Sequence, residues 1–253
     1  VGVDLMNEST FVAALRTALQ ANGWNVSGEA EEKIAALSSF LVSENEKMNL
    51  TAITDQEGIA VRHICDCVLA AGEAFFPVGG NVADIGAGAG FPTLPLAIVR
   101  PDLHITAVDA TAKRVTFIQK AASHLGLKHV TAVCARAEEM GRTQTWREQF
   151  DVVCARAVAR MQVLCEWCLP LVRCGGQFVA LKGPHGAEEC IQADNAIKLL
   201  GGGKSRVVTL YLNDPFAVPM QQLERQICVI QKITPTPQKY PRSNAQIMKK
   251  PLA

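Results

Sequence analysis

The stretch VADIGAGAGFPTLPLA, residues 82–97, places an acidic residue at the end of a short apolar run and then sets glycines at alternate positions. The run NVADI (81–85) has the length and composition of a buried strand. Glycine adopts positive φ and lets a ligand approach the backbone closely. Ligands of open parallel sheets bind beyond the carboxyl ends of the strands, where a strand turns into a helix. The stretch therefore predicts a first strand, a ligand-binding turn and a helix.

Short β-rich runs separated by helical stretches follow this motif. The runs are HITAVD (104–109), HVTAVC (129–134), FDVVCA (150–155) and GQFVALK (176–182). Strand alternating with helix is typical of parallel βαβ units. Two later runs, SRVVTLYL (205–212) and RQICVIQKI (225–233), are joined without a clear helix and predict a terminal antiparallel pair. The predicted fold class is α/β, a doubly wound Rossmann-like sheet ending in that pair.

The first 76 residues carry helical spacing and almost no strand pattern. Their helical segments are TFVAALRTALQANGW (10–24), EAEEKIAALSSFLVSENEKMNL (29–50) and EGIAVRHICDCVLAAGEAFF (57–76). The turn-rich PVGGN (77–81) then interrupts the pattern. We predict a small helical N-terminal domain over 1–76 and a sheet domain over 77–253. Residues 1–5 are consistent with a cloning remnant before a natural Met6.

Composition indicates a soluble protein of a reducing compartment. Of the 253 residues, 49% are apolar, but no apolar run approaches the ~20 residues of a membrane span, and the N-terminus lacks a signal pattern, so we expect a cytoplasmic protein. The nine cysteines are odd in number and lie mostly in apolar runs, as buried thiols do. Cys165 and Cys168 form one C-x-x-C, but MQVLCEWCLPL (161–171) has helical spacing, so we expect no metal site there.

The net charge of +1 conceals an asymmetry. Residues 1–61 carry three basic and nine acidic side chains, whereas residues 225–253 carry six basic and no acidic ones. A basic terminus is either a solvated tail or a strip that binds a polyanion, because Lys and Arg beside phosphates release counterions. The tail cations in question are Lys239, Arg242, Lys249 and Lys250. Charge alone leaves both interpretations open.

The spacing of the motif favours one nucleoside cofactor over another. Asp109 ends the second predicted strand, where a carboxylate can accept the hydroxyls of a ribose. The dinucleotide fingerprint is G-x-G-x-x-G, but this chain has Asp84 two residues before Gly86, Gly88 and Gly90. A carboxylate there repels a pyrophosphate and suits the cationic amino group of a methionine moiety. The pattern therefore favours S-adenosylmethionine (AdoMet) over NAD, with a ligand-free structural turn as the alternative.

A second glycine-rich stretch, GGGKS (201–205), resembles a phosphate-binding loop only in part. The earlier glycine of G-x-x-x-x-G-K-S is absent, because Lys198 stands at that position, and β-branched residues follow in place of a helix. We interpret it as a helix stop and a turn.

Several motifs in order resemble one enzyme family. They are NLTAITDQEGIAVRHICDCVLAA, ADIGAGAGFPTLPLAIVRPDLHITAVDATAKRVTFI, CARAEEM, FDVVCARAVA, ALKG and KYPR, from about Leu37 to the C-terminus. Together they resemble the bacterial small-subunit ribosomal RNA guanine-N7 methyltransferases, the glucose-inhibited division protein B family. The resemblance implies a class I methyltransferase sheet, AdoMet as cofactor with S-adenosylhomocysteine as product and no metal, and 16S rRNA of the small ribosomal subunit as partner.

The resemblance also implies roles for individual residues. It implies cofactor contacts at Gly86, Phe91, the Ala137–Glu138 pair and Arg156, and roles for Arg136 and Lys182 near the reacting guanine or its phosphates. Two departures from the family pattern stand out. Thr93 occupies the place of a glycine after GFP, and Ala245 and Ile247 occupy the places of a Gly-x-Pro. The first affects the start of the helix, and the second the course of the tail.

Three cations close neighbouring predicted strands: Arg136, Arg156 and Lys182. Such a group suits a polyanionic substrate, but Lys182 is alternatively a solvated strand end, and either arginine alternatively pairs with Glu138 or Asp151. Arg62 and His63 in the helical region are further candidates for lining the substrate cleft, or they form a surface or capping feature.

The sequence thus predicts a monomeric AdoMet-dependent enzyme that methylates N7 of a guanine in 16S rRNA. The acceptor N7 carries a lone pair and no proton, so catalysis needs alignment more than a base. The alternatives are a methyltransferase for a small molecule and a non-catalytic module that binds AdoMet and RNA.

Overall fold

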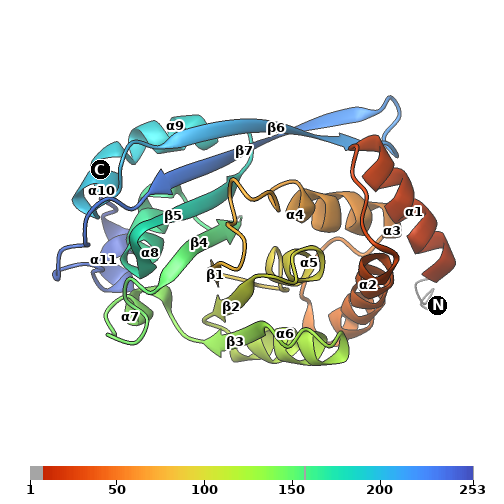
Figure 1. Ribbon diagram of the computed structural model, residues 1–253, viewed down its shortest axis with the longest axis horizontal. Coiled ribbons are helices and arrows are strands. Elements are labelled where there is room, and N and C mark those ends of the chain that lie inside the picture. Colours follow the sequence, from red (N-terminus) through yellow and green to blue (C-terminus); the bar gives the residue numbers. More distant parts are fainter. Residues whose placement is uncertain (1–7, 157, 253) are drawn as a thin grey trace.

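The structure is a computed structural model that describes residues 8–156 and 158–252 (Figure 1). The expectation about residues 1–5 and Met6 lies outside the described residues. Before the sheet come α1 (Glu8–Ala21), α2 (Gly28–Met48), α3 (Gln56–Gly58), the π-helical segment η1 (Ile59–Cys65) and α4 (Asp66–Val68). The strands are β1 (Asn81–Ile85), β2 (His104–Asp109), β3 (Val130–Cys134), β4 (Phe150–Arg156), β5 (Val172–Lys182), β6 (Arg206–Asp214) and β7 (Gln221–Gln231). The remaining helices are α5 (Thr93–Val99), α6 (Ala112–His124), α7 (Ala137–Met140), α8 (Met161–Cys168), the 3₁₀ turn η2 (Leu169–Leu171), α9 (Gly186–Gln192), α10 (Asp194–Leu199) and α11 (Asn244–Lys249).

The strands form one seven-stranded sheet of order β3-β2-β1-β4-β5-β7-β6. The pairs among β1 to β5 are parallel, β7 pairs antiparallel with β5, and β6 pairs antiparallel with β7. The order reverses between β1 and β4, which is where open α/β sheets bind their ligands. The predicted α/β sheet with a terminal antiparallel pair is confirmed.

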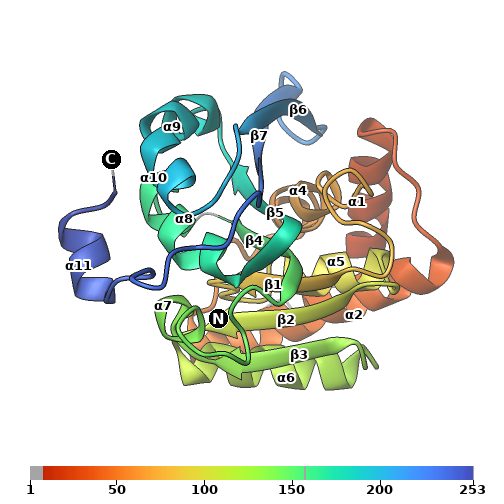
Figure 2. The same ribbon diagram turned by 60° about the vertical axis from the view of Figure 1, so that its left-hand side comes forward.

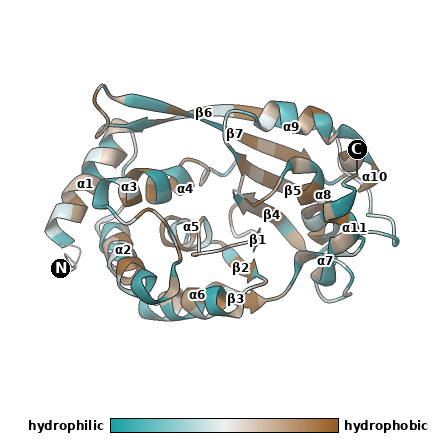
Figure 3. Ribbon diagram, turned by 180° about the vertical axis from the view of Figure 1, so that it is seen from behind, coloured by the Kyte–Doolittle hydropathy of each residue, from teal (hydrophilic) through white to brown (hydrophobic). Residues whose placement is uncertain are grey.

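Helices cover both faces of the sheet, as the turned view in Figure 2 shows. One hydrophobic cluster joins α1, α2, α5 and α6 to residues such as Val82, Ile105 and Val179 on one face. A second joins α7, α8, α9 and α10 to Val153, Phe178 and other residues of the opposite face. The central strands β4 and β5 are mostly hydrophobic in Figure 3, as expected of parallel strands buried on both faces.

Three predicted boundaries are wrong by four or more residues, one of them the start of β5, which lies at Val172 and not at 176. The helical pattern of 57–76 ends at Val68, because the chain then makes turns in which the N–H groups of Phe75 and Phe76 bond to the carbonyl of Gly72. Strand β7 starts four residues before the predicted 225, because Gln221 pairs with Asp214 in the hairpin to β6. The GGGKS stretch is a helix stop and a turn, as predicted: α10 ends at Leu199 and Gly201 has φ +85°.

The helices before β1 pack in the same hydrophobic cluster as one face of the sheet. The division into domains at residue 76 stays a prediction. None of the described helices is long and apolar enough to cross a membrane.

Candidate functional site

A cavity of about 490 Å³, the cofactor pocket, lies over the glycine-rich turn after β1. Gly86, Gly88 and Gly90 all have positive φ, at +73°, +57° and +81°. A Cβ atom on Gly86 would come within 2.8 Å of a methyl of Val158, so only glycine fits beside the loop after β4. Gly86 and Gly88 line the pocket, whereas Gly90 packs against Leu94 below it.

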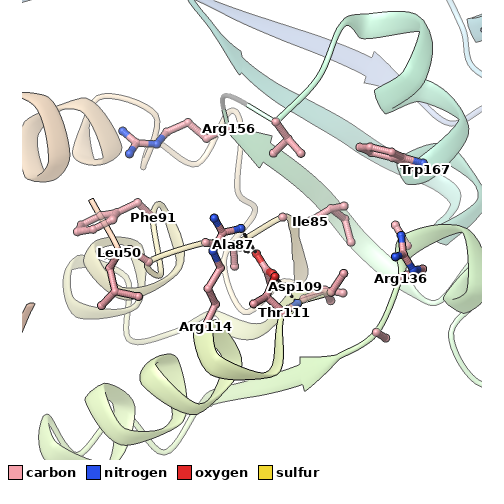
Figure 4. A pocket seen from close by; sticks show the side chains of 18 of the residues that line it. Leu50, Ile85, Ala87, Phe91, Asp109, Thr111, Arg114, Arg136, Arg156 and Trp167 are labelled. Atoms are coloured by element: carbon pink, nitrogen blue, oxygen red, sulfur yellow. Dashed lines mark hydrogen bonds and ion pairs between the residues drawn. The ribbon is translucent and has the colours of Figure 1, made fainter. Parts of the chain in front are cut away.

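Asp109 lies in the middle of the cofactor pocket (Figure 4). Its carboxylate accepts the N–H of Gly88 at 3.0 Å and that of Thr111 at 2.8 Å, and Arg114 lies 3.5 Å away as an ion-pair partner. Each carboxylate oxygen has a second lone pair. Asp109 can therefore accept further hydrogen bonds from a ligand while it holds the glycine turn.

Asp84 lies beneath the loop and does not line the cofactor pocket. Its Oδ2 accepts the hydroxyl of Thr93 at 2.6 Å and the Thr93 N–H at 3.3 Å. Burial raises the pKa of Asp84 to about 6, although the bonds from Thr93 act in the opposite direction. Thr93, which replaces a glycine of the family pattern, starts α5 and ties it to β1. The predicted contact of Asp84 with a methionine amino group stays a prediction.

One end of the cofactor pocket, here called the charged end, is formed by His63, Phe91 and Arg156. The His63 ring stacks on Phe91 at 4.4 Å between centroids and 13° between planes, and the Arg156 guanidinium lies 5.6 Å from the same ring. The Nε2 of His63 lies 2.8 Å from the Thr51 hydroxyl. Burial, assisted by the nearby Arg156 cation, lowers the pKa of His63 to about 4, so the ring is neutral at pH 7.

A second cavity of about 450 Å³, the charged pocket, shares His63 and Arg156 with the charged end. Its charged residues are Arg62, Asp66, Arg156, Lys182 and Arg225. Asp66 bridges two of them, since one carboxylate oxygen accepts from Arg156 at 2.7 Å and the other from Arg225 at 2.5 Å. Arg156 thus pairs with Asp66 and not with Glu138 or Asp151, and Asp151 pairs with Arg173 at 2.7 Å.

Lys182 has internal partners in this structure. Its Nζ lies 2.7 Å from Glu189 and donates to the Ala159 carbonyl at 2.9 Å, and its side chain is 10% exposed. The alternative of a solvated strand end is therefore wrong. Glu189 also accepts the N–H of Met161, so this ion pair holds the loop after β4 against α9.

The opposite end of the cofactor pocket, here called the tryptophan end, is formed by Trp167, Asn244 and the Arg136–Glu138 segment. Figure 4 shows Trp167 and Arg136 on the far side of Asp109 from Phe91 and Leu50. Ala137 and Glu138 are buried in the first turn of α7. Arg136 lines the cofactor pocket but not the charged pocket, so the structure does not bring it together with Lys182.

The four predicted tail cations differ in their surroundings. Arg242 makes a multiple contact with the fully buried Glu166 of α8: its N–H, Nε and Nη2 lie 2.7, 2.9 and 2.7 Å from the carboxylate oxygens. Lys239 is exposed and lies 5.3 Å from the Tyr240 ring, and Lys249 and Lys250 are exposed. Arg62 is exposed at the charged pocket.

Metal ligands do not cluster in the described part of the chain, where no three His, Cys, Asp or Glu side chains could hold an ion. Cys165 and Cys168 are buried on α8, which is the helix that their spacing predicts. Burial raises the pKa of Cys65 to about 12, so this neighbour of His63 stays a thiol.

The comparisons with known proteins agree on a family. Residues 30–217 match the family model described as rRNA small subunit methyltransferase G. Two proteins named "Ribosomal RNA small subunit methyltransferase G", from an Exiguobacterium species and from Exiguobacterium sibiricum, are 46% and 45% identical over 98% of this chain and 100% of their own length. This chain belongs to the rRNA small subunit methyltransferase G family. The predicted family and the predicted enzyme class, methyltransferase, are confirmed.

The fold is shared more widely than the family. The crystal structure of precorrin-6y C5,15-methyltransferase from Geobacter metallireducens superposes with a TM-score of 0.51 at 16% identity, covering 75% of this chain and 96% of that one. Such a likeness shows the methyltransferase fold and no more.

Several residues that line the two cavities were not predicted from the sequence of this rRNA small subunit methyltransferase G family member. Asp66 and Arg225 complete the charged pocket, and Trp167 and Asn244 complete the tryptophan end. Asp66 follows His63 at helical spacing, which was a usable signal. Ala245 and Ile247, which stand where the family pattern has Gly-x-Pro, lie in helix α11. Ile247 donates its N–H to the Ser243 carbonyl, which a proline at this position cannot do.

Proposed function

We propose that this enzyme transfers a methyl group from AdoMet to N7 of a guanine in the 16S rRNA of the small ribosomal subunit. The observation that carries the proposal is the junction of two cavities: His63 and Arg156 line both the cofactor pocket and the charged pocket. A nucleoside cofactor on one side and a polyanion on the other would meet at this junction. We further propose that the enzyme acts as a cytoplasmic monomer without a metal.

The residues of the cofactor pocket fit AdoMet. A carboxylate, Asp109, stands where a ribose would lie, and the glycine turn leaves the backbone accessible. Buried polar atoms without partners among the described residues lie at both ends, which suits a ligand that carries polar groups along its length. When bound, AdoMet supplies an electrophilic methyl group on a sulfonium.

The charged end suits an acceptor that needs no base. Guanine N7 has a free lone pair and no proton, so the chain has to align the base and does not have to deprotonate it. The neutral His63 ring, stacked on Phe91, and the guanidinium of Arg156 form a flat wall with a cation beside it. Such a wall can stack a base that has left its helix.

The charged pocket suits a nucleotide within RNA. Its four cations exceed its one carboxylate, and the excess favours phosphates and the guanine O6. Lys182 and Arg225 are held by Glu189 and Asp66, so their geometry is fixed before RNA arrives. Lys239, Lys249 and Lys250 are exposed on the C-terminal segment, and we assign them to phosphate contacts that do not read sequence. Arg242 is less available for contacts with phosphates, because it forms an ion pair with Glu166.

The test is incubation with labelled AdoMet and either small ribosomal subunits that lack the modification or a pool of metabolites. The proposal expects label in 16S rRNA as 7-methylguanine, which makes the RNA cleavable at one position by borohydride and aniline. Label in a metabolite would favour the small-molecule alternative, and no label with intact AdoMet binding would favour the non-catalytic module. Label on ribose or on an exocyclic amine would exclude N7 as the acceptor.

A further inference from the structure

The cofactor pocket contains polar atoms that the fold leaves without partners. In the described part of the chain, four buried side-chain atoms lack a hydrogen-bond partner: His63 Nδ1, Asp84 Oδ1, Trp167 Nε1 and Asn244 Oδ1. His63, Trp167 and Asn244 line the cofactor pocket, and Asp84 lies under its glycine turn. Buried polar atoms in folded proteins nearly always have partners, because an unpaired one costs free energy. The three that line the cofactor pocket indicate that a ligand there supplies their partners.

Two of these atoms belong to the tryptophan end and differ in chemistry. The indole Nε1 of Trp167 can only donate a hydrogen bond, and the amide Oδ1 of Asn244 can only accept one. Adenine presents this combination in reverse: its 6-amino group donates, and the adjacent ring nitrogens accept. One donor and one acceptor in the wall therefore match the polar edge of an adenine.

The position of the pair along the pocket selects the adenine over the rest of AdoMet. The reactive methyl must face the acceptor, and the charged pocket shares His63 and Arg156 with the cofactor pocket. Asp109, the ribose candidate, lies between that end and Trp167 (Figure 4). The adenine, on the other side of the ribose from the methyl, then belongs at the tryptophan end. This step rests on the proposed function.

The C-terminal segment is fixed firmly enough to serve as a pocket wall. Arg242 binds Glu166, the residue next to Trp167 on α8, so the segment and the indole share one anchor. Arg147 adds bonds from its guanidinium to the carbonyls of Thr236 and Tyr240. Ser243 and Gln246 form a capping box, and Ile247 is fully buried. Asn244 lies between these anchors.

We propose that Asn244 and Trp167 recognise the adenine of AdoMet, with Asn244 Oδ1 accepting from the 6-amino group and Trp167 Nε1 donating to a ring nitrogen. The C-terminal segment is then part of the cofactor site, and these two residues determine the preference for adenine over other bases.

Calorimetry with two ligands tests the role of Asn244. The ligands are S-adenosylhomocysteine and its analogue with hydrogen in place of the 6-amino group. The parent protein should prefer S-adenosylhomocysteine by about tenfold, the usual value of one well-placed hydrogen bond. Asn244→Ala should bind it about tenfold more weakly and lose the preference. Asn244→Asp, which keeps the acceptor oxygens, should retain the preference for the 6-amino group.

The control is Met248→Ala in the same helix, whose side chain is 56% exposed. It should bind both ligands as the parent does, which shows that changes in α11 alone do not move the affinity. Asn244→Ala with the parental preference would overturn the assignment of Asn244. A parent protein that binds neither ligand would instead contradict the proposed function, so the two failures are distinguishable.

Fluorescence tests Trp167 without any reaction. The chain has three tryptophans, and only Trp167 lines the cofactor pocket among the described residues. Binding of S-adenosylhomocysteine should change the emission of the parent. Trp167→Phe, which keeps an aromatic ring but removes the donor, should lose that change and bind about tenfold more weakly by calorimetry. An unaltered emission change together with parental affinity in Trp167→Phe would overturn the assignment of Trp167.

Discussion

The two ends of the cofactor pocket satisfy their polar groups in different ways. At the charged end, Arg156 already has Asp66 as a partner, and in the adjoining charged pocket Lys182 has Glu189. At the tryptophan end, the donor of Trp167 and the acceptor of Asn244 have no partner within the described residues. The cations Arg156 and Lys182 are paired before a ligand arrives, although His63 Nδ1 at the same end has no partner within the described residues, whereas the donor and the acceptor of the second end both await one.

This difference suggests two kinds of recognition in one cavity. A ligand at the tryptophan end gains hydrogen bonds that replace nothing within the chain, which favours tight and specific binding. RNA at the charged end has to share cations with Asp66 and Glu189, so it gains less affinity from each contact but meets side chains in fixed positions.

The largest expected effect comes from removing the anchor of the tryptophan end. Arg242→Ala leaves the fully buried carboxylate of Glu166 without its cation, which typically costs about 3–5 kcal/mol of unfolding free energy. The measurement is urea unfolding, with the exposed Lys249→Ala as the matched control, which should change stability by less than about 0.5 kcal/mol. A similarly small loss in Arg242→Ala would show that the C-terminal segment is held by its other contacts.

The Arg242–Glu166 pair also shows where sequence reasoning stops. The middle of the pocket was predictable, because Gly86 and Gly88 and the strand end at Asp109 follow from local rules of strand, turn and helix spacing. Arg242 and Glu166 are 76 residues apart, and Asp66 and Arg225 are 159 apart. Such pairs depend on how the helices and strands pack against one another, and the order of charged residues along the chain does not predict that packing. No acidic residue is near the basic tail in the sequence, so the pairing of Arg242 with Glu166 was not predictable.

The unpartnered atoms at the tryptophan end were equally hidden. Trp167 lies in an amphipathic helix next to the buried Glu166, so its sequence position predicts a core residue. Asn244 is one polar residue of a basic tail, and its position predicts no role. A function for Trp167 and Asn244 can be proposed only because the structure places both in the lining of the cofactor pocket. At the charged end the outcome was mixed: His63, Phe91 and Arg156 were candidates from the sequence, but Asp66, the partner of Arg156, was not.

The second prediction concerns pH at the charged end. His63 has a pKa of about 4 in the folded chain and 6.5 unfolded, so between these values the unfolded chain binds a proton that the folded chain does not. Stability therefore falls as the pH falls through this window, by up to about 3 kcal/mol. Asp84, whose pKa is raised to about 6, acts in the opposite direction, because its folded carboxyl holds a proton that the unfolded one releases.

A comparison of the parent with His63→Phe separates these two contributions. Phenylalanine keeps a ring against Phe91 but does not titrate, so between pH 6.5 and 4 the variant should lose less stability than the parent by up to about 3 kcal/mol. The measurement is urea unfolding at several pH values with the slopes checked for equality. Parallel stability curves for the two proteins would mean that His63 is not held neutral by its surroundings.

The third prediction concerns the middle of the pocket, which both ends share. Asp109→Ala should lose about 1.5–3 kcal/mol of binding free energy for S-adenosylhomocysteine, the usual value for hydrogen bonds to a charged group. The same change removes the acceptor for the N–H groups of Gly88 and Thr111, so thermal stability has to be followed in parallel. Arg114→Ala is the control, because it removes the ion-pair partner and leaves the carboxylate. Parental affinity in Asp109→Ala would remove this residue from the cofactor site.

The smallest expected effect is at Lys182, which lines the charged pocket and not the cofactor pocket. Its ammonium lies in the charged pocket and is held by Glu189 and the Ala159 carbonyl. It can therefore orient a guanine while neighbouring phosphates of the RNA do not pull it out of position. Lys182→Ala should lower the single-turnover methylation rate about tenfold, or about 1.4 kcal/mol, and leave RNA affinity nearly unchanged. Lys182→Arg, which keeps a donor cation, should recover part of the rate.

The variant Glu189→Gln tells whether Lys182 acts directly or through the loop that Glu189 holds. An equal rate loss in Glu189→Gln would assign the effect to the loop. A parental rate in Lys182→Ala, with cofactor affinity unchanged, would leave this lysine as a purely structural link between β5, α9 and the loop after β4, and the charged pocket would then orient the substrate through Arg156 and Arg225.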